Sequence, residues 1–398
     1  MKISNIRITI IIQLCLFFSC GTITGQTSDS IKNNHIIKQI GLDIAPNYVF
    51  QTKGFLKGNN EKESRIDKSM SLHIKYGFKF ANDTYLGRLY PHAYQGIGLS
   101  FNTFFNSEEV GNPIAFYLFQ GSRIATLSPK VSLDYEWNFG ASFGWKPYNI
   151  NTNKYNDIVG SRINAYLNIG IFLNWQLKKQ WNISVGIDAT HYSNGNTKYP
   201  NYGINLIGAR VGVTKVLDAE KETKINNSEK LSVEKHISYD IIVYGAWHAK
   251  GIIGENAAIP GYFGVLGLNF NPMYNINKYF KAGISLDGQY DEGANTESHI
   301  AGLDENGEIK FYRPSLSEQI GVGLSMRGEF VMPIFSINFG IGHNVVYKGS
   351  LNGLYQILAL KTNINRNLYL HIGYQLSKFK NPKNLMIGFG YRLHNKRR

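Results

Sequence analysis

Residues 181–193 read WNISVGIDATHYS and residues 205–214 read NLIGARVGVT, and both stretches alternate between apolar and polar side chains. Alternation with a period of two predicts β-strands, whose successive side chains point to opposite faces. The polar face of the first stretch carries Asp188, and that of the second carries Arg210. Charged side chains are costly in a dry core, so this face is interpreted as the lumen of a small barrel whose outer wall lies in lipid. The pair of stretches therefore predicts a transmembrane antiparallel β-barrel.

The composition of the whole chain supports an all-β protein. Of 398 residues, 43% are hydrophobic, 13% are aromatic and only 18% are charged, with 42 Lys and Arg against 28 Asp and Glu. A disordered chain would be poor in aromatic residues and rich in charge. Sparse Ala and Glu argue against an ordinary helical enzyme. No apolar run reaches the roughly 18 residues of a membrane helix, since the one near the start is too short.

Eight candidate strands precede residue 217 and about eight follow residue 235. The first set is 40–51, 70–81, 95–106, 114–127, 130–144, 161–177, 181–193 and 203–216. The second set is 236–249, 261–272, 279–290, 316–330, 333–346, 353–364, 367–377 and 385–394. The longer connections follow mostly odd-numbered strands, so these strands are expected to run outward, although the 82–94 connection is long for a periplasmic turn. Residues 38–216 are thus expected to form an eight-stranded barrel.

The remaining segments complete the predicted domain organisation. Residues 217–235 are charged and lack glycine, which favours a periplasmic linker, and residues 236–398 form a second β-rich, barrel-like half. One barrel of sixteen strands or two barrels of eight strands both fit the pattern. Residues 1–25 combine basic residues, a short apolar run and small residues, which predicts a signal peptide. Lipidation at Cys20 is the alternative. An exported, aromatic β-protein indicates the outer membrane of a Gram-negative bacterium.

A candidate catalytic constellation lies at the outward end of strand 181–193. His191 and Ser193 share one face with Cα atoms about 7 Å apart, so the two side chains can approach each other. A serine needs a neighbouring base to become a nucleophile. If Asp188 pairs with Arg210 across the hairpin, Ser193 pairs with Asn205, and a third polar group reaches the same outer wall. The alternative interpretation is a set of polar interface residues near the lipid headgroups.

The run His191-Tyr192-Ser193-Asn194, followed by Pro200-Asn201, resembles the lipid A 3-O-deacylases, the acyloxyacyl hydrolase family of outer-membrane β-barrels. The resemblance is centred on this motif, and the eight-strand pattern extends it over 38–216. It implies a serine hydrolase on the outer wall of the barrel that cleaves an ester-linked acyl chain from the lipid A of lipopolysaccharide. By residue match, Ser193 is the nucleophile and His191 is the general base. Asn194 and the backbone N–H of Gly195 stabilise the oxyanion, and Asn201 supports the site.

One position departs from the family pattern. The acidic member of the family's triad falls on Asn205, and no Asp or Glu lies between Ser193 and Asp218. An amide can orient an imidazole but cannot stabilise its positive charge, and in serine proteases such an acid-to-amide change costs roughly 10⁴-fold in rate. The expected protein is therefore an attenuated ester hydrolase, a hydrolase with a rearranged triad, or an inactive relative. The alternative is a non-enzymatic outer-membrane barrel, either structural or a narrow channel.

The remaining expectations concern partners and cofactors. The net charge of +14 is dispersed along the chain, so an anionic lipid such as lipid A is a better partner than nucleic acid, which is not expected. The histidines have no metal-binding spacing, and the acidic loop 304–308 is an incomplete calcium motif. No cofactor and no metal are therefore predicted. The sequence leaves open the oligomeric state and the role of residues 236–398.

Overall fold

The computed structural model describes residues 35–221, 235–252, 258–305, 307–379 and 381–394. The sixteen long strands form two closed antiparallel barrels of eight strands each. The predicted fold class is therefore confirmed, and the open choice between one large barrel and two small ones is decided in favour of two. In the described part of the chain, no helix has the length and the apolar character to cross a membrane.

The first barrel closes in chain order, with the last strand paired to the first. Its strands are β1 (Ile36–Val49), β2 (Lys68–Phe80), β3 (Tyr94–Thr103), β4 (Gly111–Ser128), β5 (Val131–Trp145), β6 (Ile163–Lys178), β7 (Trp181–Ser193) and β8 (Ile204–Val216). A short helix, η1 (Phe55–Lys57), lies in the connection after β1, and η2 (Ala219–Lys221) follows β8.

The second barrel closes in the same way, through β9 and β18. Its strands are β9 (Ile237–Gly251), β10 (Ala258–Asn275), β11 (Phe280–Asp291), β14 (Ile320–Val331), β15 (Phe335–Val346), β16 (Leu354–Asn363), β17 (Leu368–Ser377) and β18 (Asn381–His394). The long connection after β11 contains η3 (Thr296–His299), a hairpin of β12 (Ile300–Leu303) with β13 (Ile309–Phe311), and α3 (Leu316–Gln319), while η4 (Gly349–Leu351) follows β15.

Two connections differ from the sequence prediction. The predicted strand 316–330 starts only at Ile320, because Ser315 and Glu318 make a reciprocal capping box that begins α3. The long 82–94 connection contains α2 (Tyr85–Leu89), whose first turn is capped by the Thr84 side chain. The predicted signal peptide and residues 222–234 of the predicted linker lie outside the described residues.

The β7–β8 register also corrects the prediction. His191 pairs with Asn205, and Arg210 pairs with Gly186 rather than with Asp188. Ser193 therefore does not pair with Asn205. The reason is the length of the arginine side chain, which reaches diagonally by two residues, so that its Nε still lies 2.6 Å from the Asp188 carboxylate. Asp188 and Arg210 do lie on the same face, as predicted. Their contact does not show which residues pair across the hairpin, because the arginine side chain spans two residues.

The first lumen is closed by buried ion pairs. Asp188 is 4% exposed, whereas its neighbour Ile187 is 61% exposed on the outer wall. Arg210 contacts Asp188, and its Nη1 lies 3.1 Å from Glu136. Lys75 adds contacts of 2.7 Å to Asp43 and 3.1 Å to Glu136. The alternation seen in the sequence thus separates a lipid-facing wall from a charged interior.

The second lumen contains its own network of charges. Lys361 lies 3.0 Å from Asp240 and 2.6 Å from Glu329. Arg392 contacts the same two carboxylates, at 2.7 Å and 3.2 Å. All four side chains are buried or nearly so. Buried charged side chains therefore cross the lumen of both barrels, as expected for eight strands.

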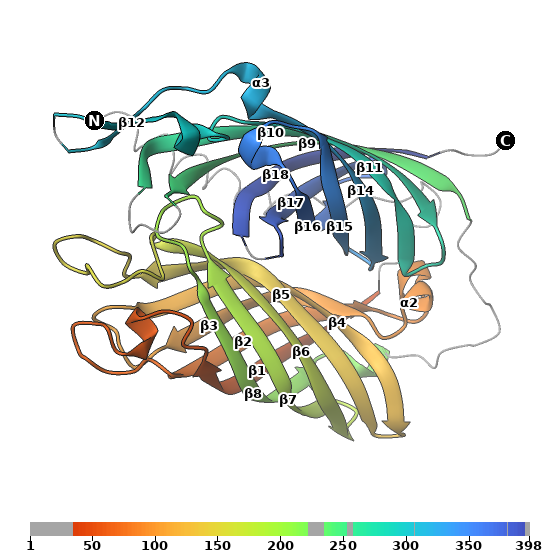
Figure 1. Ribbon diagram of the computed structural model, residues 1–398. Coiled ribbons are helices and arrows are strands. Elements are labelled where there is room, and N and C mark those ends of the chain that lie inside the picture. The colour runs from red at the N-terminus through yellow and green to blue at the C-terminus, as the bar shows by residue number, and fades with distance from the viewer. Residues whose placement is uncertain (1–34, 222–234, 253–257, 306, 380, 395–398) are drawn as a thin grey trace, which may run out of the picture.

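The two barrels lie side by side, with the long loops of both at one end and the short turns at the other (Figure 1). Towards the turn end, Trp137 of β5 packs against Phe335 of β15, with ring centroids 5.8 Å apart. At the same end, the Tyr90 hydroxyl donates to the Lys278 carbonyl over 2.8 Å. The length of the 82–94 connection is explained by this second contact, since the connection reaches the neighbouring barrel.

Candidate functional site

Tyr192 fixes the outward end of β7. Its ring is 2% exposed and lies inside the first barrel, with its centroid 5.0 Å from that of Trp145 and 5.4 Å from that of Tyr166. Because side chains alternate along a strand, its neighbours His191 and Ser193 lie on the outer wall. Both are half-buried, whereas Ile187 and Val185 further down the same face are 61% and 51% exposed. The buried aromatic residue therefore holds the two polar residues at a defined position.

His191 is oriented by Asn205. Its Nδ1 lies 2.7 Å from Asn205 Oδ1, across the β7–β8 ladder. The amide oxygen accepts only, so the imidazole must carry its proton on Nδ1 to donate it. Nε2 is then left with its lone pair, which is the state that a general base needs. The backbone of Asn205 is also held, because its carbonyl accepts from the Phe50 N–H over 2.9 Å.

Ser193 lies beside this imidazole. Gly203, with φ of +68°, brings the returning chain so close that a Cβ atom there would lie 3.1 Å from His191 Cε1 and 3.4 Å from Ser193 Cβ. The same Cβ would lie 2.7 Å from the Tyr192 carbonyl oxygen. Within the described residues, the Ser193 hydroxyl has no hydrogen-bond partner, and none joins it to His191. Catalytic contacts of this kind often tighten only when substrate binds.

The turn that follows the serine is braced from within. Asn201 Oδ1 accepts from the Asn194 backbone N–H over 2.8 Å, and the Asn194 side chain donates to the Lys198 carbonyl over 2.7 Å. Gly195 takes a φ of +64°, which glycine adopts without strain. No hydrogen bond within the described residues uses the Gly195 N–H. The Gly195 N–H is therefore without a partner in the described part of the chain, whereas the Asn194 backbone N–H and side chain each already donate one hydrogen bond.

A neighbouring loop is attached next to the site. The Gly203 N–H donates to the Ile158 carbonyl over 3.2 Å, which ties loop 146–162 to the start of β8. Burial raises the pKa of the adjacent Asp157 carboxyl, and the opposing charge of Lys53 offsets part of that effect. The Lys53 ammonium lies 3.3 Å from the ring centroid of Tyr202, a cation–π contact. The outward rim of the barrel is thus polar and ordered around the histidine and the serine.

All six residues predicted from the sequence come together at this one place. Sequence reasoning missed two further residues, Gly203 and Asn196. Gly203 had a readable signal, since a glycine directly before a strand can allow close approach of the backbone. Asn196 had none, because its side chain donates to the Pro382 carbonyl, 186 residues further along the chain.

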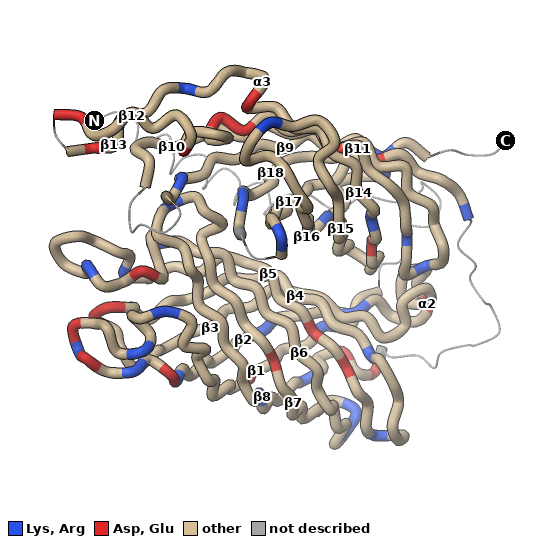
Figure 2. The backbone as a smooth tube through the Cα atoms, viewed as in Figure 1, with Lys and Arg blue, Asp and Glu red and all other residues tan. Residues whose placement is uncertain are grey.

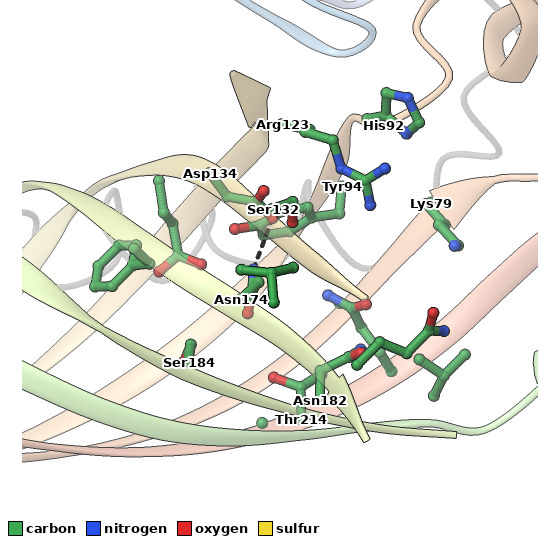
Figure 3. Close-up of a pocket in the computed structure, with 18 of the residues that line it drawn as sticks. Lys79, His92, Tyr94, Arg123, Ser132, Asp134, Asn174, Asn182, Ser184 and Thr214 are labelled. Atoms are coloured by element: carbon green, nitrogen blue, oxygen red, sulfur yellow. Dashed lines mark hydrogen bonds between the residues drawn. The ribbon is translucent and has the colours of Figure 1, made fainter. Parts of the chain in front are cut away.

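A polar cavity of about 390 Å³ lies inside the first barrel but away from this site. Figure 3 shows Arg123, Asp134 and Asn174 among its lining residues, with Asn174 donating to Asp134 over 2.6 Å. The cavity reaches the short turn at Pro129 and Lys130, at the end opposite Ser193. None of the predicted site residues lines it.

Comparisons with known proteins bear on both barrels. Residues 75–214 match the family model described as lipid A 3-O-deacylase (PagL), and residues 237–396 match the acyloxyacyl hydrolase, C-terminal domain. No curated protein matches the chain.

Solved structures show only a loose likeness. The siderophore receptor PirA from Pseudomonas aeruginosa is 8% identical, with 91% of this chain and 81% of that chain covered and a TM-score of 0.24. The outer membrane protein Omp33 from Acinetobacter baumannii is 8% identical, with 90% and 98% covered and a TM-score of 0.14. Values this low carry no argument about activity. The two family models cover most of the chain, and the chain therefore belongs to the lipid A 3-O-deacylase, or acyloxyacyl hydrolase, family.

Proposed function

We propose that the protein is a serine esterase of the outer membrane that removes an ester-linked acyl chain from the lipid A of lipopolysaccharide. Membership of the family supports a hydrolase that acts on ester bonds, and the barrel fold supports the outer membrane. The proposal assigns Ser193 as the nucleophile, His191 as the general base and Asn205 as the residue that orients the base.

The observation that carries the proposal is the 2.7 Å contact between His191 Nδ1 and Asn205 Oδ1 on the outer wall. Ser193 lies on the same face, and Gly203 brings the chain into contact range of both residues. Polar side chains at the lipid boundary are costly when they serve no purpose. A substrate whose ester bonds lie near its headgroup would present them at this height of the barrel.

The chemistry follows from the geometry. The Ser193 hydroxyl attacks the carbonyl carbon of the acyl ester, and its proton passes to His191 Nε2. The Gly195 N–H donates to the oxyanion of the tetrahedral intermediate. When the bond to the sugar oxygen breaks, His191 returns the proton to that oxygen, and an acyl-enzyme remains. Water activated by the same imidazole then releases the fatty acid and restores the serine.

Asn205 makes the proposed enzyme slow. A carboxylate at this position would stabilise the imidazolium that forms in each step, whereas the neutral amide only holds the ring in place. We expect a measurable but low turnover for the natural chain, and a faster one where an acid is restored.

The test is mass spectrometry of lipid A after incubation with the purified full chain in detergent. Wild-type protein is expected to remove one acyl chain, Ser193→Ala none, and Asn205→Glu to act faster by about 10- to 100-fold. Ser377→Ala is the matched control, since this serine lies at the end of β17 in the second barrel.

Three outcomes distinguish the possibilities. Turnover by wild type that disappears in Ser193→Ala supports the esterase. Activity only in Asn205→Glu would mean an intact site without natural turnover on this substrate. Inactivity of all variants would reject the deacylase in favour of a structural barrel. The narrow channel is the weaker alternative, because ion pairs cross both lumens.

A further inference from the structure

The turn after Ser193 is attached to the second barrel. The Ala249 N–H in β9 donates to the Asn196 carbonyl over 2.7 Å. The Asn196 side chain donates in turn to the Pro382 carbonyl in β18 over 2.6 Å. β9 and β18 are neighbouring strands, so two strand ends of the second barrel hold one residue of the first.

Packing contacts accompany these hydrogen bonds. A Cβ atom at Gly195 would lie 2.7 Å from a methyl group of Leu385, so the leucine packs directly against the glycine backbone. A Cβ atom at Gly251 would lie 2.7 Å from the ring of Tyr199. The loop that carries the candidate oxyanion donor is therefore in contact with β9 and β18 at Gly195, Asn196 and Tyr199.

A relay of amide groups connects these contacts to the site. Asn201 Nδ2 donates to Asn196 Oδ1 over 3.2 Å, and Asn201 Oδ1 accepts from the Asn194 N–H over 2.8 Å. The path thus runs from Pro382 through two asparagine side chains to the residue next to the serine. Asn196 itself takes a φ of +62°, which asparagine tolerates better than most residues.

We propose that the second barrel is a working part of the active site, because it positions the Asn194–Gly195 turn through Asn196. The inference rests on the proposed function, in which the Gly195 N–H stabilises the oxyanion. Asn196 is a positioning residue in this scheme, since it acts through its neighbours. The second barrel thereby has a role although it lacks the serine and histidine motif.

The physical reason is the precision that oxyanion stabilisation needs. A donor is effective only within hydrogen-bond distance of the developing charge, and a displacement of about 1 Å can cost about 100-fold in rate. Residues 194–203 form no helix or strand of their own. Loops of this kind move readily unless other elements hold them. The ends of two paired strands in a closed barrel provide such a rigid support.

The test compares two substitutions that each remove one contact between the barrels. Asn196→Gly deletes the side chain but keeps the carbonyl, and glycine accepts the positive φ without strain. Tyr90→Phe is the matched control, because it removes the hydrogen bond to Lys278 at the opposite end of the interface. Turnover is measured on lipid A with the full chain. The change in electrophoretic mobility between heated and unheated samples verifies that each barrel is folded.

We expect Asn196→Gly to lower kcat by about 10- to 100-fold with KM within about twofold, while Tyr90→Phe keeps both values. A kcat equal to that of wild type in Asn196→Gly would overturn the inference. So would a change confined to KM, since that would indicate a role in substrate binding.

Hydrogen exchange of the peptide that spans residues 194–203 gives a readout that needs no activity. Asn196→Gly and Leu385→Ala are expected to speed exchange in this peptide, and Tyr90→Phe to leave it unchanged. Faster exchange in a protein without turnover would reject the proposed function and keep the attachment of the turn. Unchanged exchange would reject the attachment, whether or not wild type hydrolyses lipid A.

Discussion

The hairpins β7–β8 and β17–β18 occupy equivalent places in the two barrels. Their polar pairs, however, lie on opposite faces of the barrel wall. In the first, His191 pairs with Asn205, and both side chains lie half-buried on the outer wall. In the second, Gln375 pairs with Asn384, and both are buried inside the barrel. A polar pair inside a small barrel serves packing, whereas one on the outer wall can meet a lipid. The face of the strand thus separates a candidate site from a structural contact.

The distribution of charged and apolar residues on the outer surfaces shows where the two barrels differ. Acidic and basic residues are interspersed in the loops of the first barrel at the left of Figure 2. The outer walls are dominated by exposed apolar residues such as Ile187 in the first barrel and Ile284 in the second. The two walls are therefore alike over most of their height. The difference lies at the outward rim, where the first barrel has a histidine and a serine.

The largest effect is expected from making the first hairpin resemble the second. His191→Gln keeps a polar side chain but removes the base, so hydrolysis of lipid A should fall by about 1,000-fold or more. The reverse change, Gln375→His, is the matched control and should add no activity, because position 375 faces the lumen. Measurable turnover in His191→Gln would show that the serine is activated by another group.

A second prediction compares the lumens. Arg210→Leu leaves Asp188 buried without its partner and Glu136 with Lys75 alone, and the loss of a buried ion-pair member costs about 3–5 kcal/mol of unfolding free energy. Arg392→Leu is the counterpart in the second barrel, and it should also destabilise, although Asp240 and Glu329 keep their contacts to Lys361.

Urea unfolding followed by tryptophan fluorescence separates the two variants. Four of the five tryptophans lie in the first barrel, at positions 137, 145, 175 and 181. Arg210→Leu should therefore shift most of the fluorescence transition, and Arg392→Leu only a minor part of it. Equal shifts in both variants would mean that the barrels unfold as one unit.

The smallest of these effects concerns a single methyl group. Gly195→Ala introduces a Cβ against Leu385 and strains a φ of +64°, so kcat on lipid A should fall by about tenfold or more. Gly307→Ala is the control, since its φ of +77° carries similar strain but its Cβ would have open space. Comparable losses in both variants would contradict a specific role for the turn.

The sequence by itself determined the strands and their inner and outer faces. Alternation is a local property, and the cost of exposing Asp188 or Arg210 to lipid leaves only one orientation for each strand. The approach of His191, Ser193 and Asn205 also followed, because the first two share one strand face and the hairpin brings Asn205 to the same outer wall. The family resemblance extended this to Asn194, Gly195 and Asn201.

Only the tertiary structure decided the register, the number of barrels and the support of the turn. The register depends on the whole β7–β8 hairpin, and a long arginine side chain contacts Asp188 from two residues away. Barrel closure depends on pairing between strands that are far apart in sequence, such as β9 with β18. The contact of Asn196 with Pro382 is of the same kind. Local patterns carry no information on such pairings, because their energies arise only when the folded barrels meet.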